Sequence, residues 1–237
     1  MRRLKVLVSM VLCSLAVGCR SETRQVAPRP DDAAPLVGVP TTTTPPLEEM
    51  PLVVYLGDSL AAGWGLPEDE AYPAQLDRML AERGLPVRTV NAGVSGDTTA
   101  GGLARLEWLL RLEPDVLVLE LGANDALRGL DPEVTERNLR QIIGVVRRRG
   151  PDVLLAGMKV PPNYGADYAR RFEGIFPRLA RELELAFLPF LLEEVAGRPE
   201  LNLADGIHPN AQGQRRVAEN LLPVLEGLLR RRGRFAR

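Results

Sequence analysis

Short apolar runs and longer amphipathic segments alternate along the chain from residue 52 onward. The short runs are rich in Val and Leu and predict strands; they cover residues 52–56, 87–90, 115–121, 152–158 and 186–188. The amphipathic segments predict helices; they cover residues 73–83, 99–112, 132–149, 166–184 and 210–232. We expect Pro177 to bend the fourth of these helices, because proline removes a helical hydrogen bond.

This alternation also predicts the fold class. Strands that are separated by helices pair in parallel, and right-handed crossovers place the helices on both faces of the sheet. We therefore expect an α/β protein with a doubly wound, three-layer α/β/α architecture and a five-stranded parallel sheet. In such sheets the ligand lies beyond the carboxyl ends of the strands, so chemistry is expected there.

The first twenty residues have the pattern of an export signal. Basic residues at positions 2, 3 and 5 precede an apolar run over residues 6–17, which is too short to span a bilayer. The small residues before Cys19 resemble a bacterial lipobox. That resemblance implies removal of residues 1–18, lipid attachment to Cys19 and, because Arg20 follows, sorting to the outer membrane. An ordinary cleaved signal with an incidental cysteine stays open, and both interpretations predict an exported, periplasmic protein.

Residues 19–50 predict a disordered linker. Six prolines fall between Pro28 and Pro46, together with a run of threonines, and apolar periodicity is absent. Such a segment cannot bury enough apolar surface to fold. We therefore expect one folded domain over residues 51–237, and a monomer.

The scarcity of histidine and cysteine excludes several kinds of site. His208 is the only histidine, and Cys13 and Cys19 are the only cysteines. A multi-histidine zinc site, and a disulfide or thiolate nucleophile in the folded domain, are therefore excluded. With 30 basic and 31 acidic residues the net charge is -1, which does not favour nucleic acid. We expect no metal, no cofactor and a small-molecule substrate.

Polar or glycine residues follow four of the five predicted strands. Ser59 follows the first, Gly93 the second and Asn124 the third, while Asp205 and His208 come after the fifth. Each has an ordinary structural explanation, such as a turn or a helix cap. Their occurrence in order at one edge of the sheet, with the only histidine among them, favours catalysis.

These residue types are those of a serine acyl hydrolase. Ser59 attacks a carbonyl only if a base takes its proton, and His208 is the one imidazole available. Asp205, three residues earlier, can hold the needed tautomer of that imidazole. The backbone N–H groups of Ser59 and Gly93 and the side-chain amide of Asn124 are the candidate donors to an oxyanion.

The same residues carry a family resemblance. The chain resembles the GDSL, or SGNH, hydrolases, whose signature residues are matched by Ser59, Gly93, Asn124 and His208. The resemblance spans roughly residues 52–228 and includes the segments GDSLAAGWGL, NAGVSGDTTAGGLARL, LGANDALRGL, MKVPPNYG and DGIHPNAQG. It implies a flavodoxin-like fold without a metal, with Ser59 as nucleophile, His208 as base and Asp205 as its partner. It further implies an oxyanion hole formed by Ser59, Gly93 and Asn124.

The motifs are similar to the branch with bacterial periplasmic thioesterases, lysophospholipases and arylesterases. This implies an esterase for short to medium acyl chains, presented as aryl esters, acyl thioesters or lysophospholipids. We hypothesise that the loop at residues 160–165 sets the chain length; a rigid connector is the alternative, because the loop contains two prolines. A carbohydrate O-acetylesterase and a non-catalytic lipid-binding surface lipoprotein also stay open. A nucleotide or flavin protein is disfavoured, since the chain has no GxGxxG or Walker motif.

Overall fold

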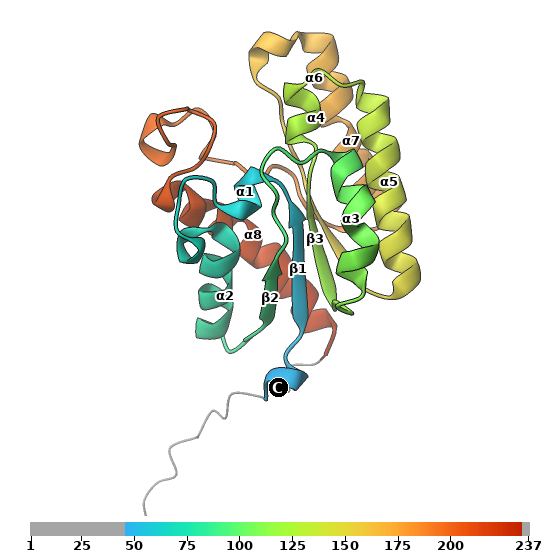
Figure 1. The fold of residues 1–237 in the computed structure, drawn as a ribbon, viewed down its shortest axis with the longest axis vertical. Helices are drawn as coiled ribbons and strands as arrows, with labels where there is room; N and C mark the ends of the chain where they lie inside the picture. Colours follow the sequence, from blue (N-terminus) through green and yellow to red (C-terminus); the bar gives the residue numbers. More distant parts are fainter. Residues whose placement is uncertain (1–45, 234–237) are drawn as a thin grey trace, which may run out of the picture. The chain divides into compact units, whose positions relative to one another are not determined.

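Five parallel strands form the central sheet (Figure 1). They are β1 (Leu52–Gly57), β2 (Arg88–Asn91), β3 (Val116–Glu120), β4 (Asp152–Ala156) and β5 (Ala186–Leu188). The spatial order is β2-β1-β3-β4-β5, and every neighbouring pair is parallel. The five-stranded parallel sheet is confirmed. Because the chain reverses its direction of winding between β1 and β3, the crevice for a ligand is expected at their carboxyl ends.

The computed structural model describes residues 46–233, which belong to one compact unit. The predicted signal peptide (residues 1–18), the lipidation candidate Cys19 and the predicted linker up to residue 45 lie outside the described residues. At the end of that linker, η2 (Leu47–Glu49) is a short, exposed 3₁₀ turn, and Met50 is already buried. The packed structure therefore begins one residue before the predicted start at residue 51.

Helices cover both faces of the sheet, which confirms the three-layer architecture (Figure 1). α2 (Tyr72–Glu82) and α8 (Ala211–Arg231) pack together on one face. α3 (Thr99–Leu110), α5 (Pro132–Arg149) and α7 (Ile175–Glu182) form the layer on the other face. Every residue of β1 and β3 is buried, because a sheet covered on both faces leaves these strands no side in water.

The ends of α5 follow local sequence signals. The Asp131 carboxylate accepts a hydrogen bond from the Glu133 N–H at 3.1 Å, and Pro132 occupies the first helical position. At the other end Gly150 has φ +107°, a conformation that favours glycine. These signals are why the predicted range, residues 132–149, is the observed one.

The fourth predicted helix is wrong in one respect. Residues 166–184 form two helices, α6 (Ala166–Glu173) and α7, and the break falls at Gly174 and not at Pro177. Pro177 lies in the first turn of α7, where its missing N–H has no helical partner to lose. A second proline, Pro223, is accommodated inside α8.

Several short helical segments were not predicted. α1 (Ser59–Ala62) follows β1 directly and α4 (Ala123–Leu127) follows β3, and both lie at the upper end of the sheet in Figure 1. The other short segments are η3 (Glu68–Glu70), η4 (Pro162–Tyr164) and η5 (Pro199–Leu201). α1 and α4 are too short to give a periodic pattern, yet they carry two of the candidate site residues.

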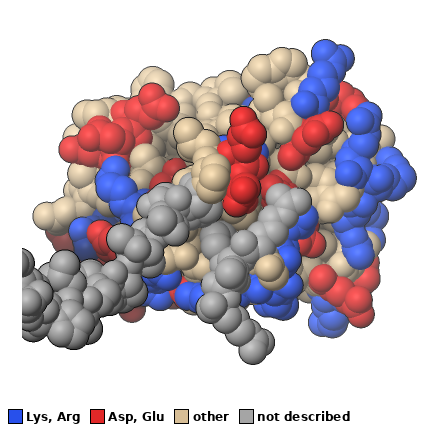
Figure 2. Space-filling view, turned by 90° about the horizontal axis from the view of Figure 1, so that it is seen from below, with Lys and Arg blue, Asp and Glu red and all other residues tan. Residues whose placement is uncertain are grey.

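The opposite end of the sheet has a different surface. Viewed from that end, Lys and Arg side chains gather on the side where α5 lies (Figure 2). α5 contributes Arg147, Arg148 and Arg149 in its last turn, where positive charge is favourable at a helix C-terminus. Among residues 46–233, the helices are too short or too polar for any of them to cross a lipid bilayer.

Candidate active site

The nucleophile candidate lies in a tight turn between β1 and α1. Asp58 caps α1, since its Oδ1 accepts a hydrogen bond from the Leu60 N–H at 3.0 Å, and Ser59 is the first helical residue. Gly57 allows the turn to approach β3, because a Cβ there would lie 2.4 Å from Glu120 Oε2. The strand, the glycine and the cap together leave Ser59 half-buried at the carboxyl edge of the sheet.

Ser59, His208 and Asp205 form one line of hydrogen bonds. His208 Nδ1 lies 2.7 Å from Asp205 Oδ2, so the carboxylate holds the Nδ1 proton. Nε2 is then free to accept from the Ser59 hydroxyl, whose Oγ lies 2.9 Å away. Residues 149 positions apart in the chain are thus brought together in the geometry of a nucleophile, its base and the group that orients the base.

Local hydrogen bonds hold the loop that carries Asp205 and His208. Asp205 Oδ1 accepts from the N–H groups of His208 at 3.0 Å and Ile207 at 2.9 Å. These two bonds and the contact with the imidazole lower the pKa of Asp205 to about 2, so the carboxylate is charged at neutral pH. The loop closes on itself through the Leu203 N–H, which donates to the His208 carbonyl at 2.7 Å.

Asn124 lies on α4, next to the turn of residues 57–60 that carries the nucleophile candidate Ser59 (the nucleophile turn). Its Nδ2 donates to Asp58 Oδ2 at 2.9 Å, which orients the amide toward that turn. A side-chain amide has two N–H donors, so one remains for a ligand. Asn124 and Ser59 line the same cavity, as the sequence predicted for one edge of the sheet.

Gly93 does not line the cavity, although its place after the second strand predicted an oxyanion donor there. Its N–H donates to Asn91 Oδ1 at 3.0 Å, and Gly93 is not among the cavity-lining residues. A Cβ at Gly93 would lie 2.4 Å from the Ala62 nitrogen and 2.8 Å from the Asp58 carbonyl oxygen. Glycine is therefore needed here for close packing of this loop against the nucleophile turn.

Gly96, three residues later, was not predicted from the sequence as a site residue. It lines the cavity with Ser59 and Asn124, and its φ of +80° favours glycine. Within residues 46–233 the N–H groups of Gly96 and Ser59 have no hydrogen-bond partner. The signal that could have found Gly96 is a second glycine in the same loop, in a turn closed by the Asp97 N–H and the Val94 carbonyl at 3.0 Å.

A cavity of about 880 Å³ adjoins the Ser59 hydroxyl. Its lining is largely apolar and comes from several loops; the apolar members include Leu60, Trp64, Leu127, Met158, Val160, Pro161, Phe190, Leu192 and Ile207. Val160 and Pro161 belong to the loop at residues 160–165, so that loop does border the site, while its effect on chain length stays a prediction. The Trp64 ring lies 5.9 Å from the His208 ring, centroid to centroid, and half of the tryptophan side chain is exposed.

The profile of the GDSL-like lipase/acylhydrolase family matches residues 55–216. The chain belongs to this family. It is 42% identical over 168 residues to an arylesterase of Vibrio mimicus, an alignment that covers 70% of this chain and 84% of the relative. It is 40% identical over 178 residues to thioesterase 1/protease 1/lysophospholipase L1 of Escherichia coli, with coverage of 75% and 84%. A crystal structure of TesA superposes with a TM-score of 0.72 at 43% identity and covers 76% of this chain and 99% of that chain. This protein is therefore a GDSL-type carboxylic ester hydrolase.

Two buried carboxyl groups lie beneath the nucleophile turn of this GDSL hydrolase. Glu120, at the end of β3, is fully buried, and its Oε2 accepts from the N–H groups of Asp58 and Ala61, both at 3.2 Å. Burial raises the pKa of Glu120 well above its usual range, and the nearby Asp58 carboxyl adds to this rise. Burial also raises the pKa of Asp58, to about 6, although the hydrogen bonds that it accepts from Leu60 and Asn124 favour its charged form. We infer that Glu120 is the protonated member of the pair.

Replacement of Glu120 by glutamine should change how stability depends on pH. A carboxyl with a raised pKa stabilises the folded state below its ordinary pKa, and this contribution is lost as pH rises toward the folded-state value. Glutamine keeps an acceptor for both N–H groups but has no proton to lose. As pH rises above the ordinary glutamate pKa of about 4.3, wild-type stability should therefore fall relative to Glu120→Gln in thermal unfolding.

The matched control for this titration is Glu133→Gln, since the Glu133 side chain is 72% exposed. This variant makes the same Glu-to-Gln exchange at an exposed carboxylate, so its difference from the wild type should not show the fall in stability expected for Glu120. Equal pH dependence of melting temperature in the wild type and Glu120→Gln would contradict a protonated Glu120.

Proposed function

We propose that this GDSL hydrolase is a serine esterase that cleaves short to medium acyl esters, with Ser59 as nucleophile, His208 as general base and acid, and Asp205 as the orienting carboxylate. The observation that carries the proposal is the unbroken pair of hydrogen bonds, 2.9 Å from Ser59 Oγ to His208 Nε2 and 2.7 Å from Nδ1 to Asp205. The esterase names of the relatives agree with it.

The proposed reaction has two steps. His208 Nε2 takes the Ser59 proton as Oγ attacks the acyl carbon; the imidazolium then gives that proton to the departing alcohol or thiol, and an acyl-serine remains. Water enters, loses a proton to Nε2 and attacks the acyl carbon, and the proton returns to Ser59 Oγ as the carboxylic acid leaves. Asp205 stays charged throughout and stabilises the imidazolium, in keeping with its lowered pKa.

We assign the oxyanion donors to the Ser59 N–H, the Gly96 N–H and the Asn124 side-chain amide. Support comes from their common position around one cavity and from the two backbone N–H groups that lack partners within residues 46–233. Gly96 takes the role that the sequence predicted for Gly93, whose N–H donates a hydrogen bond to Asn91. Three donors placed in advance are the largest expected source of rate enhancement.

The apolar cavity supports acyl chains longer than acetyl. Its volume of about 880 Å³ and its lining of Leu, Met, Val, Phe and Ile side chains suit an alkyl chain. The Trp64 ring, beside His208, offers an aromatic surface near the group that protonates the leaving alcohol. We therefore propose aryl esters, acyl thioesters and lysophospholipids as substrate classes.

The proposed location rests on the sequence of residues 1–20. We infer export to the periplasm and attachment to the outer membrane through a lipid on Cys19; the described residues do not include this segment. Mass spectrometry of the mature N-terminus separates a lipid-modified Cys19 from an ordinary cleaved signal.

A monomer is supported by the fact that one chain contributes Ser59, His208 and Asp205.

The testing experiment compares one octanoyl group as a nitrophenyl ester and as a CoA thioester, with Ser59→Ala protein as the blank. We expect Ser59-dependent hydrolysis of both, with the aryl ester faster because of Trp64. Nitrophenyl acetate and acetylated xylan complete the panel. Activity confined to acetyl substrates would instead support a carbohydrate O-acetylesterase. No hydrolysis and no labelling by a fluorophosphonate would support a lipid-binding protein without catalysis.

A further inference from the structure

Arg105, on α3, makes three hydrogen bonds next to the site without lining the cavity. Its Nε donates to Asp97 Oδ2 at 2.8 Å, its Nη1 to the Ala92 carbonyl at 2.6 Å and its Nη2 to the Gly57 carbonyl at 3.0 Å. The Arg105 side chain is only 23% exposed and that of Asp97 only 11%. Few side chains can bind three acceptors in fixed directions, and the planar guanidinium is the one best suited to it.

The three acceptors belong to the two segments that supply the backbone oxyanion donors. Ala92 begins and Asp97 ends the loop that contains Gly96, so Arg105 binds both ends of that loop. The Gly57 carbonyl is the last of β1, and it also accepts from the Val94 N–H at 3.1 Å. One guanidinium therefore ties the Gly96 loop to the strand that leads into Ser59.

Because the peptide bond is planar, the hydrogen bond from Arg105 to the Gly57 carbonyl also fixes the orientation of the next N–H group. The Gly57 carbonyl shares a peptide plane with the Asp58 N–H, so fixing the carbonyl also fixes that N–H, which donates to Glu120 Oε2. Arg105 and Glu120 thus hold opposite sides of the same peptide unit, one residue before Ser59. A charged donor also polarises the carbonyls it binds, which strengthens hydrogen bonds further along the chain of dipoles.

We propose that Arg105 is a positioning residue for ester hydrolysis: it sets the distance and direction between the Ser59 and Gly96 N–H groups and so keeps the oxyanion hole arranged before the substrate binds. This inference rests on the proposed function. Since a misplacement of about 1 Å in such an arrangement can cost about 10²-fold in rate, loss of Arg105 should affect the transition state far more than substrate binding.

The test uses Arg105→Ala and Arg105→Lys in the full-length exported protein. For Arg105→Ala, we expect kcat to fall about 10²-fold, close to the loss of one oxyanion donor, while KM changes less than about threefold. Arg105→Lys keeps the charge but cannot bind the three acceptors in the same directions, so its kcat should lie between those of the wild type and Arg105→Ala. An alkyl trifluoromethyl ketone, which mimics the tetrahedral oxyanion, should lose affinity in proportion to kcat, whereas octanoate should bind as before.

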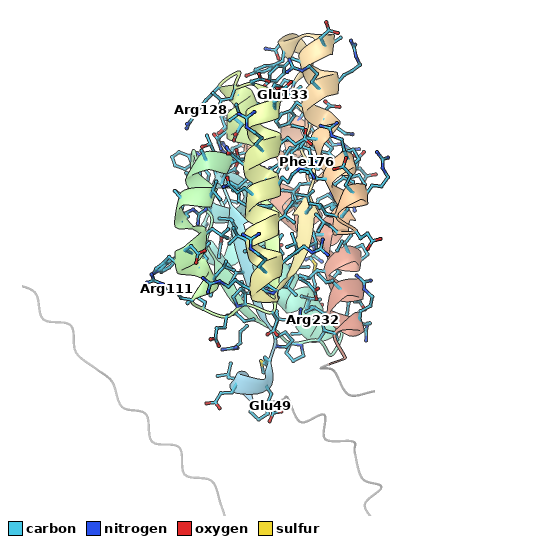
Figure 3. All side chains as sticks on the ribbon, turned by 90° about the vertical axis from the view of Figure 1, so that its right-hand side faces the viewer. Glu49, Arg111, Arg128, Glu133, Phe176 and Arg232 are labelled. Carbon is cyan, nitrogen blue, oxygen red and sulfur yellow. The ribbon has the colours of Figure 1, made fainter. Side chains whose placement is uncertain are left out.

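A matched control separates positioning from general stability. Arg232 has the same 23% exposure and binds the carboxylates of Asp152 at 2.6 Å and Asp115 at 3.5 Å. It lies at the end of the domain opposite to Arg128, whose Nη2 donates to the Gly96 carbonyl at 2.7 Å (Figure 3). Arg232→Ala should therefore lower the melting temperature with kcat unchanged. Millimolar methylguanidine should restore part of the kcat of Arg105→Ala, and urea, its uncharged analogue, should not.

The outcomes are distinguishable. If the wild type hydrolyses the ester and Ser59→Ala does not, but Arg105→Ala keeps the wild-type kcat or keeps its affinity for the trifluoromethyl ketone, the inference is overturned while the proposed function stands. If Arg105→Ala does not fold, Arg105→Lys decides: a kcat and ketone affinity equal to those of the wild type overturn the inference, and a parallel loss of both supports it. A wild type without esterase activity overturns the proposed function and this inference together.

Discussion

Ser59→Ala should lower kcat for ester hydrolysis by about 10⁴- to 10⁶-fold, the range for loss of a serine nucleophile that acts with its base. The reason is that the Oγ 2.9 Å from His208 Nε2 is the atom proposed to form the acyl-enzyme. The fold should persist, because Ser59 is half-buried and, within residues 46–233, its side chain is hydrogen-bonded only to His208. The measurement is kcat on octanoyl nitrophenyl ester, together with the melting temperature.

Covalent labelling gives a second readout for the same residue. A fluorophosphonate should label the wild type once per chain, on the peptide that contains Ser59, and should not label Ser59→Ala. Ser95→Ala is the matched control, since Ser95 lines the same cavity and should not be the labelled residue. Labelling that survives in Ser59→Ala and disappears in Ser95→Ala would show that the wrong serine has been assigned.

His208→Ala should cause a loss in kcat comparable with that of Ser59→Ala, because the two residues act as a unit. No second histidine exists in the chain to replace it. Asp205→Asn should cost about 10⁴-fold, since an amide in its place favours the wrong imidazole tautomer while the geometry is kept. The comparison to make is kcat for the two variants and for the wild type, with added imidazole as a rescue reagent for His208→Ala. Near-wild-type turnover by His208→Ala without imidazole would remove the general base from the scheme.

The pKa of Asp205 sharpens this second prediction. Because the pKa lies near 2, below the ordinary value for an aspartate, the stabilising contribution of the charged carboxylate is complete above about pH 4 and is lost only as pH falls toward 2. Activity between pH 5 and 8 should therefore show no titration of Asp205. Titration of the Asp205 carboxyl group itself between pH 5 and 8, followed by NMR, would contradict the assignment.

The sequence was most informative where local rules decide the structure. The runs of Val and Leu that form β1 and β3 are buried on both faces of the sheet. A short, continuous apolar run is typical of a central strand in a parallel sheet that is covered on both faces. The bounds of α5 followed from Asp131, Pro132 and Gly150, each of which acts through its own backbone. The prediction failed at Gly174 and Pro177, because the effect of a proline depends on which turn of the helix it occupies.

For the site, the chain order of Ser59, Asn124, Asp205 and His208 was enough to expect them at one edge of a parallel sheet, since that follows from topology alone. The sequence was not enough to tell which glycine lines the cavity. Gly93 and Gly96 lie in the same loop, and the path of the loop backbone decides that Gly93 packs against the nucleophile turn while Gly96 lines the cavity. The partners of Glu120 and Arg105 were likewise hidden. Their hydrogen bonds join them to backbone atoms tens of residues away in the sequence. Every residue type has a backbone carbonyl, and nearly every type has an N–H, so residue identity does not indicate such partners.

The sequence by itself therefore determined the fold class, the order of the strands and helices along the chain, and the side chains that can perform acyl transfer. Only the tertiary structure decided the shape and lining of the cavity, the choice of Gly96 and the buried support around the nucleophile turn. The physical reason is range: strand and helix formation depend on neighbours in sequence, whereas a cavity and an oxyanion hole are made by backbone groups that meet only after the sheet has assembled.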